Sequence, residues 1–158
     1  MNYIFLDVDG VLNNINHYKK QHKKYGGRFF CQNMPFNPRS LKNLRRIAKK
    51  TNSSIILTSS WRNSHDAMVV LEARLAEYGL KILSKTEYLE GKRGIEIVKW
   101  IEKEKIDAIE DRFIIIDDEM YDILDHFADS YIVKINSKYG LTYFKALEAI
   151  IKLRKEKK

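Results

Sequence analysis

Short apolar runs alternate with longer amphipathic segments along most of the chain. Continuous apolar stretches predict strands that are covered on both faces, because a half-exposed strand would alternate between apolar and polar residues. The alternation of strand and helix predicts an α/β fold, an open Rossmann-like parallel sheet with helices on both faces. The predicted strands are 3–7, 53–58, 80–83, 112–117 and 130–135, and the predicted helices are 36–50, 64–79, 94–104, 119–127 and 140–158.

Two of the predicted helices carry clear signals at their ends. Asn37 is a suitable N-cap, and Pro38 follows at the first helical position, where a missing N–H costs nothing. Ser64 is the expected cap of the next helix, and Gly79 is expected to stop it.

The domain organisation predicted from length is a single domain over residues 1–158. Residues 13–36 show no regular spacing of apolar residues and are rich in Asn, Lys, Tyr and Phe. We interpret this segment as a small cap inserted after the first strand. A small cap would leave a site at the strand ends open to large substrates.

The single cysteine and the lengths of the apolar runs indicate in which cellular compartment the protein is expected. One cysteine, Cys31, permits no disulfide within the chain, which fits a reducing cytoplasm. The first residues do not resemble a signal peptide, and no apolar run approaches the length of a membrane span. We therefore expect a cytoplasmic protein without membrane contact.

Charge is distributed very unevenly along the chain. Residues 10–65 contain twelve Lys and Arg and no Asp or Glu, so the net charge of +8 arises in this window. Such a one-sided field attracts polyanions, and a nucleic acid or another phosphate-rich molecule is the expected partner. The alternative is a solvated basic face that only maintains solubility.

Polar side chains gather where the predicted strands end. Carboxyl ends of parallel strands meet at one edge of a sheet, where open α/β folds bind ligands. A carboxylate can attack a phosphoryl group, a second acid can move the proton, and grouped carboxylates favour Mg²⁺. An Asp-Gly turn is the simpler alternative for the first of these groups. The residues are Asp7, Asp9, Thr58, Ser59, Lys92, Arg93, Asp117 and Asp118.

The order of these groups resembles a known motif set. DVDGVLN, ILTSSW, a Lys/Arg pair before a helix, and IIIDDE resemble the four motifs of haloacid dehalogenase-like (HAD) phosphohydrolases. Together with KRGIEIVKWI and YGLT, they resemble the HAD domain found in Swiss Army knife RNA repair proteins. The set is similar, more distantly, to the 3′-phosphatase domain of polynucleotide kinases.

The resemblance implies a role for each matching residue. Asp7 would be the nucleophile and a metal ligand, and Asp9 the general acid/base, with its backbone carbonyl on Mg²⁺. Asp118 would bind the metal directly, with Asp117 beside it. Thr58 or Ser59 would bind the phosphoryl group.

The third motif leaves the choice of cation open. The superfamily favours Lys and therefore Lys92, whereas the smaller RNA repair group favours Arg at the position of Arg93. Either residue could also be a plain surface charge.

Several residues keep a purely structural alternative. Residues 58–60 could cap the next helix, and residues 117–119 could begin a helix and complement its dipole. Arg62 is expected either to bind substrate phosphate or to form a structural salt bridge, and Trp61 to belong to the core or the wall of the site. The four histidines lack metal-ligand spacing and are expected to have no special role.

The predicted cap combines cations with aromatic residues, as single-strand-binding surfaces do. Phe29 and Phe30 fit packing of the cap against the domain better than contact with a strand. The predicted activity is removal of a terminal phosphate from RNA, DNA or a nucleotide, and the alternatives are a phosphatase of small metabolites and a non-catalytic nucleic-acid-binding module. The cap cations are Lys19, Lys20, Lys23, Lys24 and Arg28.

Overall fold

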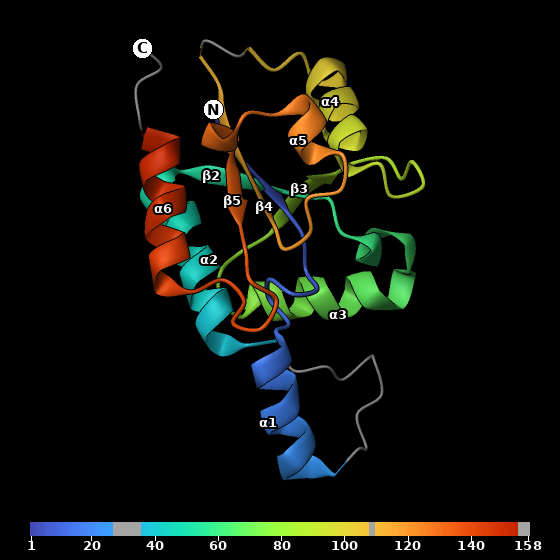
Figure 1. Cartoon of the computed structure of the whole chain (residues 1–158), viewed down its shortest axis with the longest axis vertical. Helices are drawn as coiled ribbons and strands as arrows, with labels where there is room; N and C mark the ends of the chain where they lie inside the picture. The colour runs from blue at the N-terminus through green and yellow to red at the C-terminus, as the bar shows by residue number, and fades with distance from the viewer. Residues whose placement is uncertain (27–35, 108–109, 155–158) are drawn as a thin grey trace.

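Five parallel strands form the centre of the protein. The computed structural model describes residues 1–26, 36–107 and 110–154. The strands lie in the order β3-β2-β1-β4-β5 and every pair is parallel (Figure 1). The predicted α/β sheet is therefore confirmed. The strands are β1 (Asn2–Leu6), β2 (Ser53–Leu57), β3 (Ile82–Lys85), β4 (Arg112–Asp117) and β5 (Ile132–Lys134).

Helices cover both faces of this sheet because successive strand residues point in opposite directions. Ile4 and Leu6 of β1 belong to one core with α2, α3 and α6, whereas Tyr3 and Phe5 belong to a second core with α4 and α5. Both cores are apolar, which explains the continuous hydrophobic strands. The helices are α2 (Pro38–Thr51), α3 (His65–Ala76), α4 (Arg93–Lys103), α5 (Ile123–His126) and α6 (Tyr143–Arg154).

The predicted caps of α2 and α3 are confirmed. The Asn37 side chain accepts from Arg39 N, and the Ser64 side chain accepts from Ala67 N. Several boundaries differ from prediction, including the end of α3 at Ala76 instead of Gly79 and the start of α6 at Tyr143 instead of residue 140. Strand β3 begins at Ile82, and α5 covers only Ile123–His126 instead of residues 119–127. Within the described residues, the connections also contain two short 3₁₀ turns, η2 (Ser60–Asn63) and η3 (Asp129–Tyr131).

A helix stands in the segment for which the sequence predicted only an insertion. Helix α1 (Ile15–Tyr25) projects from the end of the molecule beside the carboxyl ends of the strands (Figure 1). Its first turn is hydrogen-bonded to the loop between β5 and α6, since Ile15 N donates to Ser137 O at 3.0 Å. Across the described part of the chain, no helix has the length and apolarity needed to cross a membrane.

Candidate active site

Asp7 is the residue that follows strand β1. Its backbone N–H donates to Ile116 O at 3.0 Å, so the start of the loop stays joined to β4. Its side chain is buried, accepts from Arg93 Nη1 at 3.1 Å and accepts a hydrogen bond from the Ser59 hydroxyl. Asp7 is therefore an oriented carboxylate within the protein rather than part of an exposed turn.

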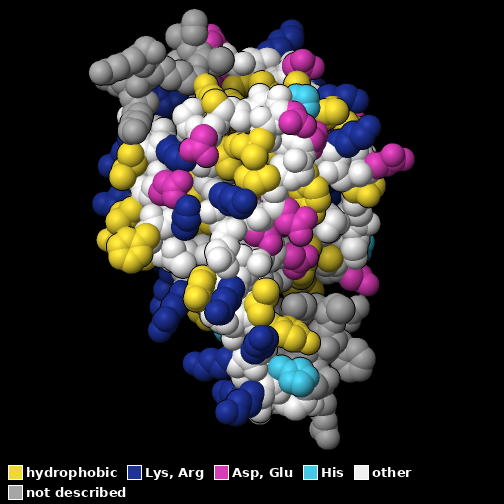
Figure 2. Space-filling model, viewed as in Figure 1, with side chains coloured by type: hydrophobic (Ala, Val, Ile, Leu, Met, Phe, Trp, Pro, Cys, Tyr) yellow, Lys and Arg dark blue, Asp and Glu magenta, His cyan; other side chains and the backbone are white. Residues whose placement is uncertain are grey.

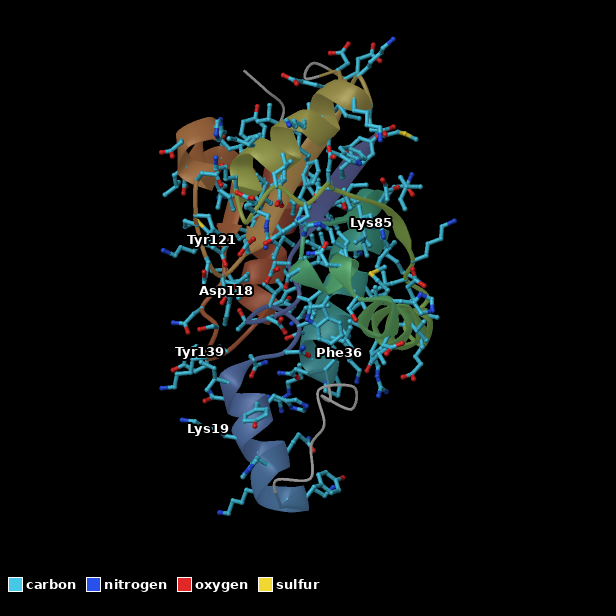
Figure 3. All side chains as sticks on the ribbon, turned by 90° about the vertical axis from the view of Figure 1, so that its right-hand side faces the viewer. Lys19, Phe36, Lys85, Asp118, Tyr121 and Tyr139 are labelled. Atoms are coloured by element: carbon cyan, nitrogen blue, oxygen red, sulfur yellow. The ribbon has the colours of Figure 1, made fainter. Side chains whose placement is uncertain are left out.

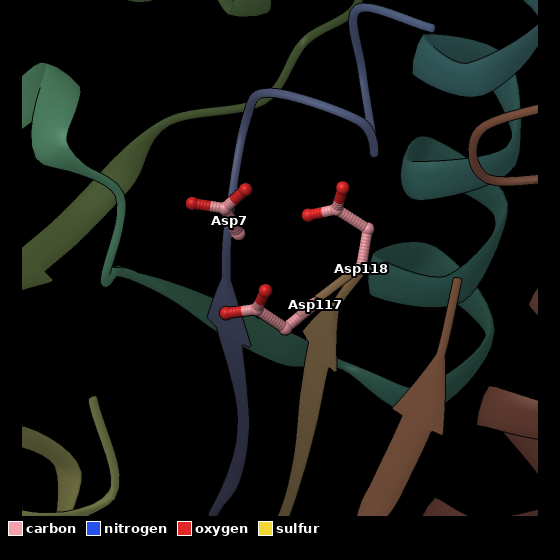
Figure 4. Close-up of side chains that lie close together, drawn as sticks. All are labelled: Asp7, Asp117 and Asp118. Carbon is pink, nitrogen blue, oxygen red and sulfur yellow. The ribbon is translucent and has the colours of Figure 1, made fainter. Parts of the chain in front are cut away.

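Asp117 and Asp118 bring two more carboxylates to the same place from the end of β4. Asp7, Asp117 and Asp118 each offer an oxygen, and these oxygens lie within 4.8 Å of one another. Figure 4 shows the three carboxyl groups around a common space at the ends of the two strands. The two acids at the end of β4 do not begin a helix, because α5 starts only at Ile123.

Burial and mutual repulsion make these carboxyl groups hard to ionise. Burial, followed by the charge of Asp7, raises the pKa of Asp117 to about 8 and that of Asp118 to about 6. Burial also raises the pKa of Asp7, although Arg93 opposes this effect. A set of oxygen donors that is short of positive charge fits Mg²⁺, which binds through one or two carboxylates and substrate oxygens. The side chain of Asp9 is not part of the three-carboxylate group.

Gly10 permits the loop after β1 to lie against Asp118. The residue has φ +74°, and a Cβ built there would lie 2.1 Å from Asp118 Oδ2. Any side chain would therefore displace the carboxylate, in addition to straining the backbone.

Arg93 supplies the cation at the centre of the site. Its Nη1 donates to Asp117 Oδ2 at 2.8 Å, to Asp7 Oδ1 at 3.1 Å and to Thr58 Oγ1 at 3.2 Å. Lys92, directly before it, is exposed. Of the two cations of the predicted third motif, the fold thus brings Arg93 to the carboxylates.

A second ion pair lies behind Arg93. Arg62 Nη2 donates to Glu96 Oε2 at 2.7 Å, and the Arg62 guanidinium also donates to the Thr58 carbonyl. The same Glu96 oxygen lies 3.7 Å from Arg93 Nε. Arg62 therefore makes the salt bridge that was one of its two predicted alternatives, while it also lines the pocket.

The residues after β2 connect these groups with Asp9. Ser59 caps η2 by accepting from Trp61 N at 3.5 Å, so the predicted capping contact exists beside the contact with Asp7. Trp61 Nε1 donates to Asp9 Oδ2 at 2.8 Å, and Asn13 Nδ2 donates to Asp9 Oδ1 at 3.2 Å. The Asp9 carboxylate is thus exposed but held in position from two sides.

A pocket of about 360 Å³ opens over these groups. Its volume falls in the range of roughly 300–1,000 Å³ that small-molecule sites occupy. The acids Asp7, Asp9 and Asp118 and the cations Arg62 and Arg93 are among its lining residues. The pocket is therefore polar and of mixed charge.

Four of the five predicted cap cations lie on α1, whose first residue, Ile15, lines the pocket. Lys19, Lys20, Lys23 and Lys24 are exposed on this helix, and Arg28 lies outside the described residues, as do Phe29 and Phe30. Figure 2 shows basic side chains along α1 below a group of carboxylates over the loops that follow the strands. In Figure 3, Lys19, Asp118 and Tyr121 lie along the same side of the molecule.

Sequence reasoning missed four residues that build the site. In the sequence, Glu96 looks like an ordinary acid on a helix surface. The function of Gly10 depends on a residue from another strand. Trp61 was expected in the core or wall, without its bond to Asp9. Asp122 accepts from Gly94 N at 2.7 Å and Ile95 N at 3.1 Å, so it holds the start of α4 next to Arg93. The signal that the sequence offered for Glu96 was its position one helical turn after Arg93, on the same face of the helix.

The comparisons with known proteins agree with this geometry. The chain matches the family described as the HAD domain in Swiss Army Knife RNA repair proteins over residues 3–146. No curated protein and no solved structure gave a significant match. The matched region contains every motif residue of the pocket. The chain belongs to the family of HAD domains in Swiss Army Knife RNA repair proteins.

Proposed function

We propose that this protein is a Mg²⁺-dependent phosphohydrolase that removes a terminal phosphate from a nucleic-acid strand through an aspartyl-phosphate. The observation that carries this proposal is the group of Asp7, Asp117 and Asp118 beside an open pocket, in which Asp7 and Asp117 share the guanidinium of Arg93. Such a combination of acids and a cation suits phosphoryl transfer, in which catalysis consists mainly of positioning and charge stabilisation.

Asp7 acts as the nucleophile and Asp9 as the general acid/base. A carboxylate oxygen of Asp7 attacks phosphorus, the bond to the leaving oxygen breaks, and Asp9 gives that oxygen its proton. Asp9 then takes a proton from water while the water oxygen attacks phosphorus and the bond to Asp7 breaks. The products are the dephosphorylated strand and inorganic phosphate.

The metal would be held by the carboxylate group and by the backbone carbonyl of Asp9. Asp118 is the more available ligand, because both oxygens of Asp117 already accept hydrogen bonds from Arg93 and Glu119 N. Bound Mg²⁺ would neutralise phosphate charge and orient the phosphoryl group. Arg93 and the Thr58 and Ser59 hydroxyls would bind the phosphoryl oxygens, whereas Lys92 and Arg62 would act from farther away.

The nature of the substrate is inferred from the family description and from helix α1. Four exposed lysines on this helix, whose first residue lines the pocket, would contact the phosphates of a strand. The family occurs in RNA repair proteins, so the terminal phosphate of an RNA strand is the substrate that its description favours.

Phosphate release from defined oligonucleotides tests this function. RNA and DNA strands with a 3′ or 5′ phosphate are incubated with the protein, with Mg²⁺ or with EDTA, beside nucleotides and sugar phosphates. We expect Mg²⁺-dependent release from a strand end. Asp7→Asn should lower its rate by about a thousandfold or more, because the nucleophile is lost.

Asp66→Asn is the matched control, because it changes an exposed acid on α3. Release only from small metabolites would contradict the nucleic-acid substrate and retain the chemistry. Tight binding of oligonucleotides without any release would support a binding module instead.

A further inference from the structure

Two exposed tyrosines stand at the mouth of the pocket. Tyr88 is 53% exposed and Tyr121 is 56% exposed, and both line the pocket. They follow β3 and β4, which flank the central pair β2 and β1 in the sheet. The two rings therefore approach the pocket from loops on either side of the strand that carries Asp7.

Each tyrosine ring lies over an arginine of the site. The Arg93 Cζ atom is 5.6 Å from the centre of the Tyr121 ring, and the Arg62 Cζ atom is 5.6 Å from the centre of the Tyr88 ring. Contact with a cation from the pocket side orients both rings, although more than half of each residue remains exposed.

The backbone of Tyr121 also shows that its position is constrained. Tyr121 has φ +39°, in the left-handed region that bulky residues rarely adopt. Residues kept in such a conformation cluster at ligand sites, where the surrounding structure compensates for the strain.

We propose that Tyr121 and Tyr88 bind the terminal nucleotide by stacking against its base. This inference rests on the proposed function and names the part of the substrate that the pocket recognises. Arg93 links the carboxylates with the aromatic surface, because it contacts Asp7 at 3.1 Å and also faces the Tyr121 ring. A phosphate held at Arg93 thus places the attached nucleotide beside an exposed aromatic surface. Stacking on tyrosine tolerates any base and suits a repair enzyme that meets ends of any sequence.

A matching Arg–Tyr contact outside the pocket supplies an internal control. Arg46 Cζ lies 4.7 Å from the centre of the Tyr143 ring, and Tyr143 is 48% exposed. Tyr143 does not line the pocket. Removing this ring repeats the loss of an exposed Arg–Tyr contact without touching the site.

Binding of strands with and without a terminal base tests the proposal. The probes are fluorescent single strands that end in a methylenephosphonate, which cannot be hydrolysed, on either a normal or an abasic terminal nucleotide. Dissociation constants are measured with Mg²⁺ for the full chain. We expect the base to tighten binding about 5- to 100-fold.

The variants decide whether the tyrosines cause this difference. Tyr121→Ala and Tyr88→Ala should each reduce the advantage of the base-bearing end. Tyr121→Phe, which keeps the ring, and Tyr143→Ala should preserve it. Equal binding of the two ends, or an advantage that survives both alanine substitutions, would overturn the proposal, and so would its loss in Tyr121→Phe.

The binding measurement separates failure of this inference from failure of the proposed function. A base-dependent difference that requires the two rings would support stacking even if no phosphate is released in the activity assay. Release of phosphate from strand ends together with equal binding of both probes would overturn the stacking alone.

Discussion

Asp7 and Asp9 are two residues apart in the sequence but have very different surroundings. Asp7 is 7% exposed and faces Arg93, whereas Asp9 is exposed and is held by Trp61 and Asn13. A buried, oriented carboxylate suits attack on phosphorus, and an exposed one can exchange protons with water. The proposed division of labour between the two acids thus follows from environment rather than residue type.

Gly10 offers a sharp test at the residue scale. Gly10→Ala should push the Asp118 carboxylate away, because the new Cβ would lie 2.1 Å from its oxygen. We expect Mg²⁺ affinity to fall about tenfold or more, by analogy with the loss of groups that orient metal ligands. Isothermal titration of the purified variant with Mg²⁺ measures this change.

Gly79→Ala is the control for backbone strain. Gly79 has φ +65°, close to that of Gly10, and no heavy atom lies within 4 Å of a Cβ built there. If both variants bind Mg²⁺ equally well, the contact of Gly10 with Asp118 does not shape the metal site.

Among the elements, α1 differs from the other long helices in having no buried residue. None of its eleven residues, all of which the structure describes, is buried. The helix is maintained by its ends, since Asn14 accepts from His17 N and Gly26 N donates to His22 O. A helix of this length has marginal stability by itself. Its lysines near the C-terminus interact favourably with the helix dipole. Beyond this interaction with the dipole, the four lysines are exposed and add no packing to the core, which supports a role in binding.

Neutralising these lysines should weaken binding of nucleic acid. We expect Lys19, Lys20, Lys23 and Lys24, changed together to Gln, to raise the dissociation constant for a phosphate-terminated strand. The slope of log affinity against log salt should fall by up to about 0.7 per lost phosphate contact on a single strand. Fluorescence anisotropy at several salt concentrations gives both quantities.

A set of four exposed lysines at the other end of the molecule gives the matched control. Lys81, Lys99, Lys103 and Lys105 precede β3 or lie near the end of α4, by the amino ends of the strands. Their change to Gln removes the same charge. If both sets alter the slope equally, only net charge matters and α1 is no specific surface.

At the scale of the whole molecule, the sheet concentrates negative charge at one edge. The strand order places β1 beside β4, so three carboxylates converge where the two strands end. Arg93 compensates for only part of this charge. The fold therefore retains a repulsion that a bound cation would relieve.

Mg²⁺ should accordingly stabilise the folded protein. A ligand that binds only the folded state at a hundred times its dissociation constant adds about 2.7 kcal/mol. For a chain of this size, we expect Tm to rise by roughly 5–10 °C. Thermal unfolding followed by circular dichroism, with Mg²⁺ and with EDTA, measures the shift.

Asp118→Asn checks the origin of that stabilisation. It removes one of the repelling charges, so the metal-free variant should unfold at a higher temperature than the metal-free wild type. It should also lose most of the Mg²⁺-dependent rise. An equal rise in both proteins would show that Mg²⁺ acts elsewhere.

The sequence alone determined what depends on neighbours along the chain. Apolar runs such as those of β1 and β4 must be buried, and the caps Asn37 and Ser64 act within one helical turn, so the α/β fold and the starts of α2 and α3 were predictable. The grouping of acids, hydroxyls and a cation followed from the rule that parallel strands end at one edge. Helix α1 escaped prediction because, without a buried face, it has no apolar period.

Only the tertiary structure decided the contacts between distant segments. Lys92 and Arg93 are neighbours in the sequence, but Arg93 is the first residue of α4 whereas Lys92 precedes the helix as its non-helical N-cap. The docking of α4 on Asp122 therefore determined that Arg93, and not Lys92, meets Asp7 and Asp117. The burial of Glu96 and the seating of Gly10 against Asp118 likewise depend on the packing of separate strands and helices. These are distances in space, which no local pattern of residues encodes.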